Sequence, residues 1–376
     1  MNARLDLNLN AFRTYMRRNH IPIEQVTKHF PKITKDILDS DSSNENLSLT
    51  FNQLVKLAKI VQVPTGLLVL NSPLPPEKLK INFRTLNSHQ LFEMSTELKD
   101  TVLEMQEKQE FLRTVVENEL KFVDSVKVND HTSEKLIISE IREMLGTELV
   151  HNRFERYRRL LGERGVFIFL NGKYKDNTHR PLDLSEFRGF VLSDRKAPII
   201  FINQQDSKTG RLFTMIHELV HLFFGDSDLL EGDGSNHHSR LEAKVNRITA
   251  EILVPESFIL QEYNDRESVT SNLENIARKT EVSRLVVLRR LYDLAIIQKK
   301  TFEDLKEEFE YNFQEIPSKT VQSGGNYHTN LSFRIDRNFF NYVNNAVKQN
   351  LLSYTEAFNL VGVGYKGYKY LSEKGG

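Results

Sequence analysis

The sequence predicts a mostly helical α+β protein in which several helical regions surround one small mixed β-sheet. Apolar residues recur at helical spacing over residues 1–70 and again beyond residue 89. Three short segments rich in Phe, Ile and Val lie between residues 165 and 203, and each is bounded by Gly, Asn, Asp or Pro, as strands are. The length of 376 residues suits two or three domains rather than one.

The composition restricts the classes of partner and of metal site. Lys and Arg number 51 and Asp and Glu also number 51, so no net charge draws the whole molecule to nucleic acid or to an acidic membrane. The chain has no cysteine, which leaves histidines and carboxylates as metal ligands. The N-terminal MNARLDLNLN lacks the apolar region of a signal peptide, and no stretch approaches the roughly 20 apolar residues of a membrane span. We therefore expect a cytoplasmic protein with no membrane partner.

Residues 1–70 have the pattern of a compact helical unit. The segment LTFNQLVKLAKIVQVPTGLLVL (49–70) starts from a Thr50 cap and breaks at Pro64. This pattern resembles the XRE (lambda-repressor-like) helix-turn-helix, which implies such a domain over 1–70. The stretch expected to form the recognition helix, 32–44, carries Asp36, Asp39 and Asp41 with only two lysines, so phosphates repel it. We expect weak DNA binding and favour a docking role for this domain.

A linker and a helical arm are expected over residues 71–160. The prolines of NSPLPPEKLKINFRTLNS (71–88) disfavour a helix, a long charged helical region follows at 89–127, and a shorter helix is expected around 137–145. The strands are predicted at GVFIFLN (165–171), FRGFVLS (187–193) and APIIFIN (197–203).

The strongest chemical signal is HELVH, inside FTMIHELVHLFFG (213–225) directly after the third strand. On a helix His217 and His221 lie one turn apart on one side, so both imidazoles can reach one ion. Glu218 is their neighbour and can act as a general base toward water without being a ligand. The surrounding residues are apolar nearly all round the helix, which predicts that the helix is buried.

A third ligand is expected at Glu242, in HHSRLEAKVNRITAEILVP (237–255). This segment has the pattern of an amphipathic helix that Pro255 ends, long enough after His221 for a loop and a return helix. Glu251 is the competing carboxylate, but it lies nine positions further on and points elsewhere. Asn246, one turn after Glu242, is placed to orient an imidazole. A His-His-Glu set leaves a fourth position open, which is typical of catalytic zinc.

These segments together resemble the ImmA/IrrE family of metallopeptidases. The resemblance rests on APIIFIN, FTMIHELVHLFFG, the ExxxN that begins at Glu242 and the following AEILVP, with NFRT, IREMLG and FRGF at similar places. It implies a gluzincin-type zinc endopeptidase core over 161–265, with His217, His221 and Glu242 as zinc ligands and Glu218 as the catalytic residue. The sequence departs from the family's AN-x-FAA by having VNRITA at 245–250, a change that touches packing rather than ligands.

The resemblance also implies a substrate. Members of the family typically cleave XRE-type repressors of mobile elements or stress regulons, so we expect a protein substrate that is a helix-turn-helix repressor. Such a substrate could add as a strand to the edge of 197–203. His237, His238, Arg240 and Tyr263 are the candidates for stabilising the oxyanion. The rival hypothesis is a DNA-binding or protein-binding transcriptional regulator, including a toxin–antitoxin type, in which the peptidase fold is a sensor.

Two further regions follow the expected core. Residues 266–310 have the rhythm of a helix-turn-helix-like pair capped by Ser283, with Arg284, Arg289 and Arg290 after the cap. Such pairs are common packing units, and DNA contact is the alternative. Residues 318–376 are expected to form a C-terminal helical cap with helices near 336–349 and 353–361.

Overall fold

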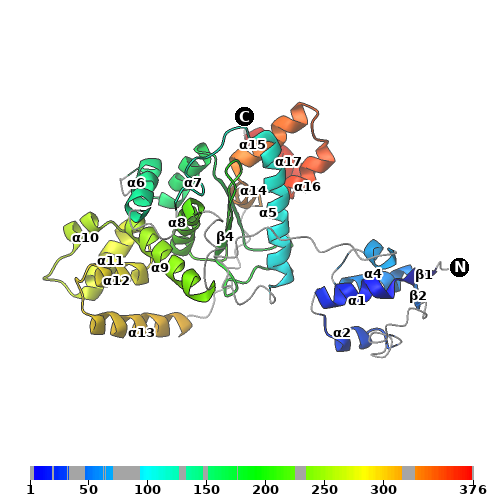
Figure 1. The fold of residues 1–376 in the computed structure, drawn as a ribbon, viewed down its shortest axis with the longest axis horizontal. Coiled ribbons are helices and arrows are strands. Elements are labelled where there is room, and N and C mark those ends of the chain that lie inside the picture. The colour runs from blue at the N-terminus through cyan, green and yellow to red at the C-terminus, as the bar shows by residue number, and fades with distance from the viewer. Residues whose placement is uncertain are drawn as a thin grey trace. The chain divides into compact units, whose positions relative to one another are not determined.

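The computed structural model describes residues 4–18, 21–31, 33, 47–61, 63, 65–70, 94–126, 133–146, 151–175, 177–224, 234–315 and 327–374. The chain divides into two compact units, residues 1–79 and 80–376, and each is described by itself. The labels of helices and strands are those of Figure 1.

The first unit combines helices with a two-stranded sheet. Its elements are β1 (Arg4–Leu7), α1 (Leu9–Arg18), α2 (Ile23–Thr27), β2 (Leu47–Thr50), α4 (Phe51–Ile60) and the 3-10 helix η1 (Thr65–Val69). The Thr50 cap predicted for α4 is confirmed, because the Thr50 side chain accepts from the Gln53 N–H and the Gln53 side chain accepts from the Thr50 N–H. The helical unit expected over residues 1–70 also contains a small sheet that the sequence did not predict, since β1 and β2 pair antiparallel. Apart from Ile33, the expected recognition helix lies outside the described residues, as does the linker 71–88.

The second unit holds the predicted core. Its elements are α5 (Thr96–Val115), α6 (Ser133–Leu145), α7 (Arg153–Glu163), β3 (Phe167–Asn171), β4 (Gly189–Leu192), β5 (Ile199–Asn203), α8 (Lys208–Phe224), α9 (Gly234–Leu253), α10 (Glu256–Glu262), α11 (Val269–Thr280), α12 (Arg284–Asp293), α13 (Lys299–Glu315), α14 (Tyr327–Arg334), α15 (Arg337–Lys348), α16 (Tyr354–Val361) and α17 (Tyr365–Lys374). None of the described helices is long and apolar enough to cross a membrane.

The three predicted strands form the small mixed sheet, in the order β3-β5-β4. β3 pairs parallel with β5, and β4 pairs antiparallel with β5. The prediction of a mostly helical α+β fold with a mixed sheet is therefore confirmed. One expectation is wrong: a substrate cannot add to the edge of 197–203, because β5 is the central strand and both of its edges are already hydrogen-bonded.

The two faces of the sheet differ in composition. Ile168, Ile200 and Ile202 belong to the core that also contains the apolar residues of α8. Phe169 and Phe201 lie on the other face, where the Phe169 ring is 5.2 Å from the ring of Phe339 in α15. Figure 1 shows the sheet between α8 on one side and α5 on the other. The motif helix is thus held against an aliphatic face.

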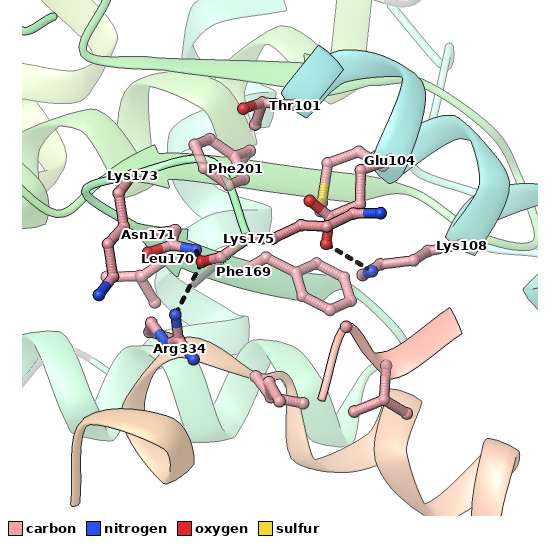
Figure 2. Close-up of a pocket in the computed structure, with 14 residues that line it drawn as sticks. Thr101, Glu104, Lys108, Phe169, Leu170, Asn171, Lys173, Lys175, Phe201 and Arg334 are labelled. Carbon is pink, nitrogen blue, oxygen red and sulfur yellow. Dashed lines mark hydrogen bonds and ion pairs between the residues drawn. The ribbon is translucent and has the colours of Figure 1, made fainter. Parts of the chain in front are cut away.

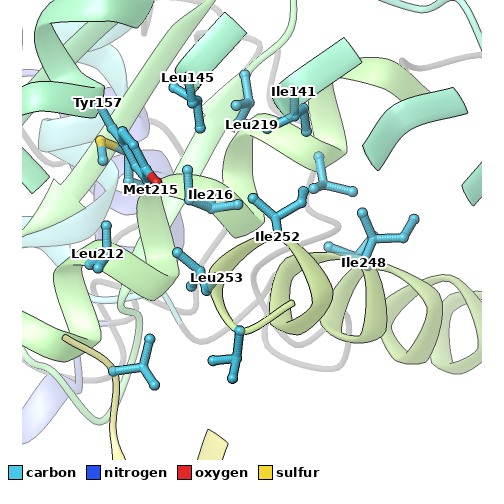
Figure 3. Packing of buried hydrophobic residues seen from close by; sticks show 14 of the residues in the cluster. Ile141, Leu145, Tyr157, Leu212, Met215, Ile216, Leu219, Ile248, Ile252 and Leu253 are labelled. Carbon is cyan, nitrogen blue, oxygen red and sulfur yellow. The ribbon is translucent and has the colours of Figure 1, made fainter. Parts of the chain in front are cut away.

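The motif helix α8 is surrounded by packed helices. Figure 3 shows part of this core, in which α8 residues meet residues from α6, α7 and α9. The labelled members are all buried and are Ile141, Leu145, Tyr157, Leu212, Met215, Ile216, Leu219, Ile248, Ile252 and Leu253. Burial of this many apolar side chains, at about 1.5–3 kcal/mol each, fixes how α8 and α9 lie relative to one another.

The charged helical region predicted over 89–127 is shorter than expected. The helix α5 ends at Val115, and residues 116–126 run back to the end of α8. The N–H of Asp124 donates to the Leu222 carbonyl, and the N–H groups of Ser125 and Val126 donate to the Phe223 carbonyl. These bonds satisfy carbonyls that the last turn of α8 leaves without partners, so this segment caps the motif helix.

A fully buried arginine joins α7, α9 and α11. Nη1 of Arg153 donates to the carbonyls of Leu253 and Thr280, the last residues of α9 and α11. The Glu281 carboxylate in turn accepts from the N–H groups of Asn152 and Arg153. The predicted helix pair after residue 266 is therefore bound to the end of α9.

Candidate metal centre

His217 and His221 project from one side of α8, as their spacing predicts. Their Nε2 atoms are 3.1 Å apart and their ring centroids are 4.8 Å apart. His221 is 3% exposed, and the rings lie among apolar residues of the helix. Two imidazole nitrogens are therefore held at one point by a rigid and buried element.

Glu242 reaches the same point from α9. Its Oε2 lies 3.4 Å from Nε2 of His217, and its Oε1 lies 3.2 Å from Nε2 of His221. Burial would raise the pKa of the Glu242 carboxyl, but the hydrogen bonds and charges of the two histidines outweigh burial and lower that pKa well below its ordinary value. Glu242 is thus ready to act as an anionic ligand.

Glu251, the competing carboxylate, serves a different purpose. Its Oε1 accepts from Arg142 of α6 at 2.7 Å, and its Oε2 is paired with Arg290 of α12. Arg290 also donates to the Val254 carbonyl. The structure therefore directs Glu251 away from the histidines and into the packing of α9 against its neighbours.

The spacing of the three residues fits a zinc ion. The candidate ligand atoms of His217, His221 and Glu242 all lie within 4.8 Å of one another, and the nearest pairs are 3.1–3.4 Å apart. Zinc bound tetrahedrally at about 2.0–2.1 Å places its ligands about 3.3 Å from one another. The donor set also matches the preference of zinc for imidazole and carboxylate in a chain without cysteine.

Glu218 lies beside this cluster and is buried, with 2% exposure. Burial first, and the charge of Glu242 second, raise the pKa of the Glu218 carboxyl well above its ordinary value. Within the described part of the chain, its Oε2 has no hydrogen-bond partner. A buried carboxylate of high proton affinity with an unused oxygen has the properties of a general base.

Gly189 of β4 makes room for this arrangement. A Cβ at this position would lie 2.5 Å from Cγ2 of Thr214 and 2.8 Å from the carbonyl oxygen of Phe201. It would also lie 3.5 Å from Oε1 of Glu218. Only a residue without a side chain allows α8 to approach β4 this closely, so the glycine of FRGF helps to place Glu218. Sequence reasoning noted FRGF without finding this role.

Three other residues singled out in the sequence lie at the surface or in the packing of the core. Asn246 is exposed on α9, where it does not serve as the expected support for an imidazole. Arg240 is exposed, and Tyr263 packs against the hydrophobic core at the end of α10. The side chains of His237 and His238 lie outside the described residues.

The arginines of α12 are engaged within the protein. Arg284 pairs with Glu274 and lies 4.9 Å from the centroid of the Phe309 ring in α13. Arg289 pairs with Asp293 and lies over the Tyr292 ring at 5.7 Å. These contacts fit the packing unit that the sequence favours, and DNA contact through this pair stays the untested alternative.

Comparison with known proteins agrees with the geometry. None of the curated proteins compared with the chain matches it. Residues 166–292, which run from the start of β3 into α12, match the family model of the IrrE N-terminal-like domain, Peptidase_M78. This stretch contains the two histidines, Glu242 and the candidate general base Glu218. The match implies metallopeptidase activity. Residues 166–292 are therefore an IrrE N-terminal-like peptidase domain with a cluster suited to a metal ion.

Proposed function

We propose that the protein is a zinc-dependent endopeptidase whose ligands are His217, His221 and Glu242 and whose general base is Glu218. The observation that carries the proposal is the convergence of two imidazoles and one carboxylate at 3.1–3.4 Å beside a buried glutamate. Three protein ligands with an open fourth position are the arrangement of catalytic rather than structural zinc.

The metal ligands and Glu218 have different roles in the reaction. His217, His221 and Glu242 would hold the zinc ion, which would supply Lewis-acid polarisation of the scissile carbonyl and of a water molecule at neutral pH. Glu218 accepts the proton of the attacking water on Oε2. The Glu218 carboxyl then passes this proton to the leaving amine. The apolar core around α8 limits water access to these charged groups.

The peptide would lie along β4 rather than β5. Asn203 donates its N–H to the Arg188 carbonyl, so these two residues form a hydrogen-bonded pair. Hydrogen-bonded and non-hydrogen-bonded pairs alternate along an antiparallel ladder. The main-chain groups of Gly189 and Val191 therefore point away from β5. No described strand pairs with this edge of β4. Gly189 is also the β4 residue next to Glu218, which puts an added strand beside the catalytic carboxylate.

We further propose that the substrate is a folded regulatory protein, an XRE-type repressor. The support is the extent of the chain outside the domain 166–292, which includes a separate compact unit at residues 1–79 and four helices after residue 326. These parts offer surfaces that can select one protein over another. General substrates such as casein should then be cut slowly or not at all.

The test of catalysis is Glu218→Gln, which removes the proton acceptor and preserves the shape of the side chain. We expect the variant to keep its metal content and fold while peptide hydrolysis falls on the order of 10²–10⁴-fold. Cleavage of a candidate repressor is followed by mass spectrometry of the products. Near wild-type cleavage by the variant would remove Glu218 from the mechanism.

The test of specificity is deletion of residues 1–79, the first compact unit. We expect cleavage of the repressor to weaken while zinc content is unchanged, because the ligands all lie in the second unit. If the full-length chain digests unrelated unfolded proteins efficiently and the deletion changes nothing, the regulatory part of the proposal fails and only a zinc peptidase remains.

A further inference from the structure

We propose that Gln106 of α5 positions the substrate by donating a hydrogen bond to the main chain of the peptide that adds to β4. This inference rests on the proposed function, because it concerns the same edge of the sheet. It assigns a role to a helix that precedes the matched domain at residues 166–292 and that contributes none of the candidate metal ligands.

The Gln106 side chain has a hydrogen-bond donor that the folded protein does not use. Its Nε2 is buried and, among the described residues, has no hydrogen-bond partner. Leaving a buried donor unpaired is unfavourable, and nearly all buried polar groups in folded proteins are paired. The neighbouring Gln109 follows this rule, since its Nε2 donates to the carbonyls of Leu192 and Ala197 at 3.0 and 2.9 Å. The exception at Gln106 is the property expected of a donor that serves a ligand.

Gln106 lies on the flank of α5 that faces β4. Ser95, the N-cap of α5, donates its N–H and its hydroxyl to the Glu186 carboxylate at 2.7 and 2.6 Å. Arg113, in the last turn, donates from Nε to Oδ2 of Asp194 at 2.7 Å. Gln106 comes eleven residues after Ser95 and seven before Arg113, which is close to three turns and two turns of helix. These three side chains therefore lie along one line of α5, and both ends of the line are bound to residues that flank β4.

The opposite flank of α5 has different neighbours. Figure 2 shows Glu104 and Lys108 of α5 beside a hollow over Phe169. Nζ of Lys108 donates to the Leu360 carbonyl of α16 at 2.7 Å. Gln106 is two residues from Glu104 and two from Lys108, and residues at that spacing do not face the same side of a helix. The Gln106 amide is thus directed away from the C-terminal helices.

Along β4 the position of Gln106 corresponds to Val191. The contacts of α5 occur in the same order as the residues that they reach, so α5 and the segment 186–194 run in the same direction. Gln106 precedes Gln109 by three residues, or about 4.5 Å of helix. A strand rises about 3.3 Å per residue, so Gln106 is level with the residue before Leu192, which is Val191.

The edge of β4 at Val191 is where a peptide would pair. The main-chain groups of Val191 point away from β5, and an added strand would lie about 4.8 Å beyond them. Because Nε2 of Gln106 is a donor only, its partner on the peptide is a main-chain carbonyl. Pairing with Gly189 and Val191 alone offers few contacts, so a further donor at a fixed position would hold the register of the peptide over the metal centre.

The test compares Gln106→Met with Gln109→Met in the full-length protein. Met is close to Gln in shape and in helix propensity but has no amide donor. With the candidate repressor as substrate, Gln106→Met should raise KM about threefold to tenfold, the effect of one lost hydrogen bond, with kcat and zinc content unchanged. Its urea midpoint should be equal to or higher than that of wild type, because an unpaired buried donor has been removed. Gln109→Met should instead lower the midpoint, since it removes two buried hydrogen bonds.

The outcomes separate this inference from the proposed function. If wild type does not cleave the repressor, the proposed function fails and the inference falls with it. If wild type cleaves the repressor and Gln106→Met leaves KM unchanged, the inference alone is overturned, because the amide does not contact the peptide. A urea midpoint of Gln106→Met below that of wild type also overturns the inference, because the amide then stabilises the fold.

Discussion

Gly189→Ala tests whether the close approach of β4 to α8 requires a residue without a side chain at position 189. The added methyl group would lie 2.5 Å from Cγ2 of Thr214 and 2.8 Å from the Phe201 carbonyl oxygen. Thr214 can change its rotamer, because Thr has two common rotamers in a helix. The Phe201 oxygen cannot yield in that way, since it belongs to the main chain of the central strand β5. Relief therefore requires that α8 or the sheet move.

The magnitude follows from overpacking of a closely packed core, which costs about 1–3 kcal/mol. We expect the free energy of unfolding to fall by that amount in urea denaturation followed by circular dichroism. Adding Thr214→Ser removes the nearer contact and should restore part of the loss. Gly364→Ala is the matched control, because a Cβ there meets nothing within 4 Å, and it should change stability by less than about 0.5 kcal/mol. Gly189→Ala with wild-type stability would refute the reasoning.

Two further predictions concern the buried arginine and the first unit. Arg153→Met should lower the free energy of unfolding by about 2–4 kcal/mol, because the buried carbonyls of Leu253 and Thr280 lose their donor. The control Arg159→Met, on the exposed side of the same helix, should cost less than about 0.5 kcal/mol. A fragment of residues 1–80 should bind duplex DNA weakly in a fluorescence titration, and sub-micromolar, sequence-selective binding at physiological salt would contradict this expectation.

Patterns with local causes could be predicted from the sequence. The three strands are short apolar segments bounded by turn residues, and the structure has them at nearly the predicted positions. The HELVH spacing places His217 and His221 together because helical geometry alone determines it. Glu242 could be chosen over Glu251 because nine residues on a helix turn the second carboxylate elsewhere. Whether these residues bind metal is still a prediction.

Features that depend on distant pairing could not be predicted. β1 and β2 are four residues each, which is too short for an alternating pattern to be recognised. They pair with one another although they lie far apart in the sequence. The central position of β5 is a property of strand order, which no single strand encodes. The capping of α8 by residues 124–126 and the role of Gly189 likewise arise only when separate segments meet.

The most direct test of the metal centre is the zinc content of three purified proteins, measured by elemental mass spectrometry. Wild type and Glu251→Gln should each carry about one zinc ion per chain, since Glu251 faces Arg142 and Arg290 rather than the histidines. Glu242→Gln should lose most of its zinc under a limiting chelator. If Glu242→Gln retains zinc as wild type does, or if Glu251→Gln is the variant that loses it, the assignment of the third ligand is wrong.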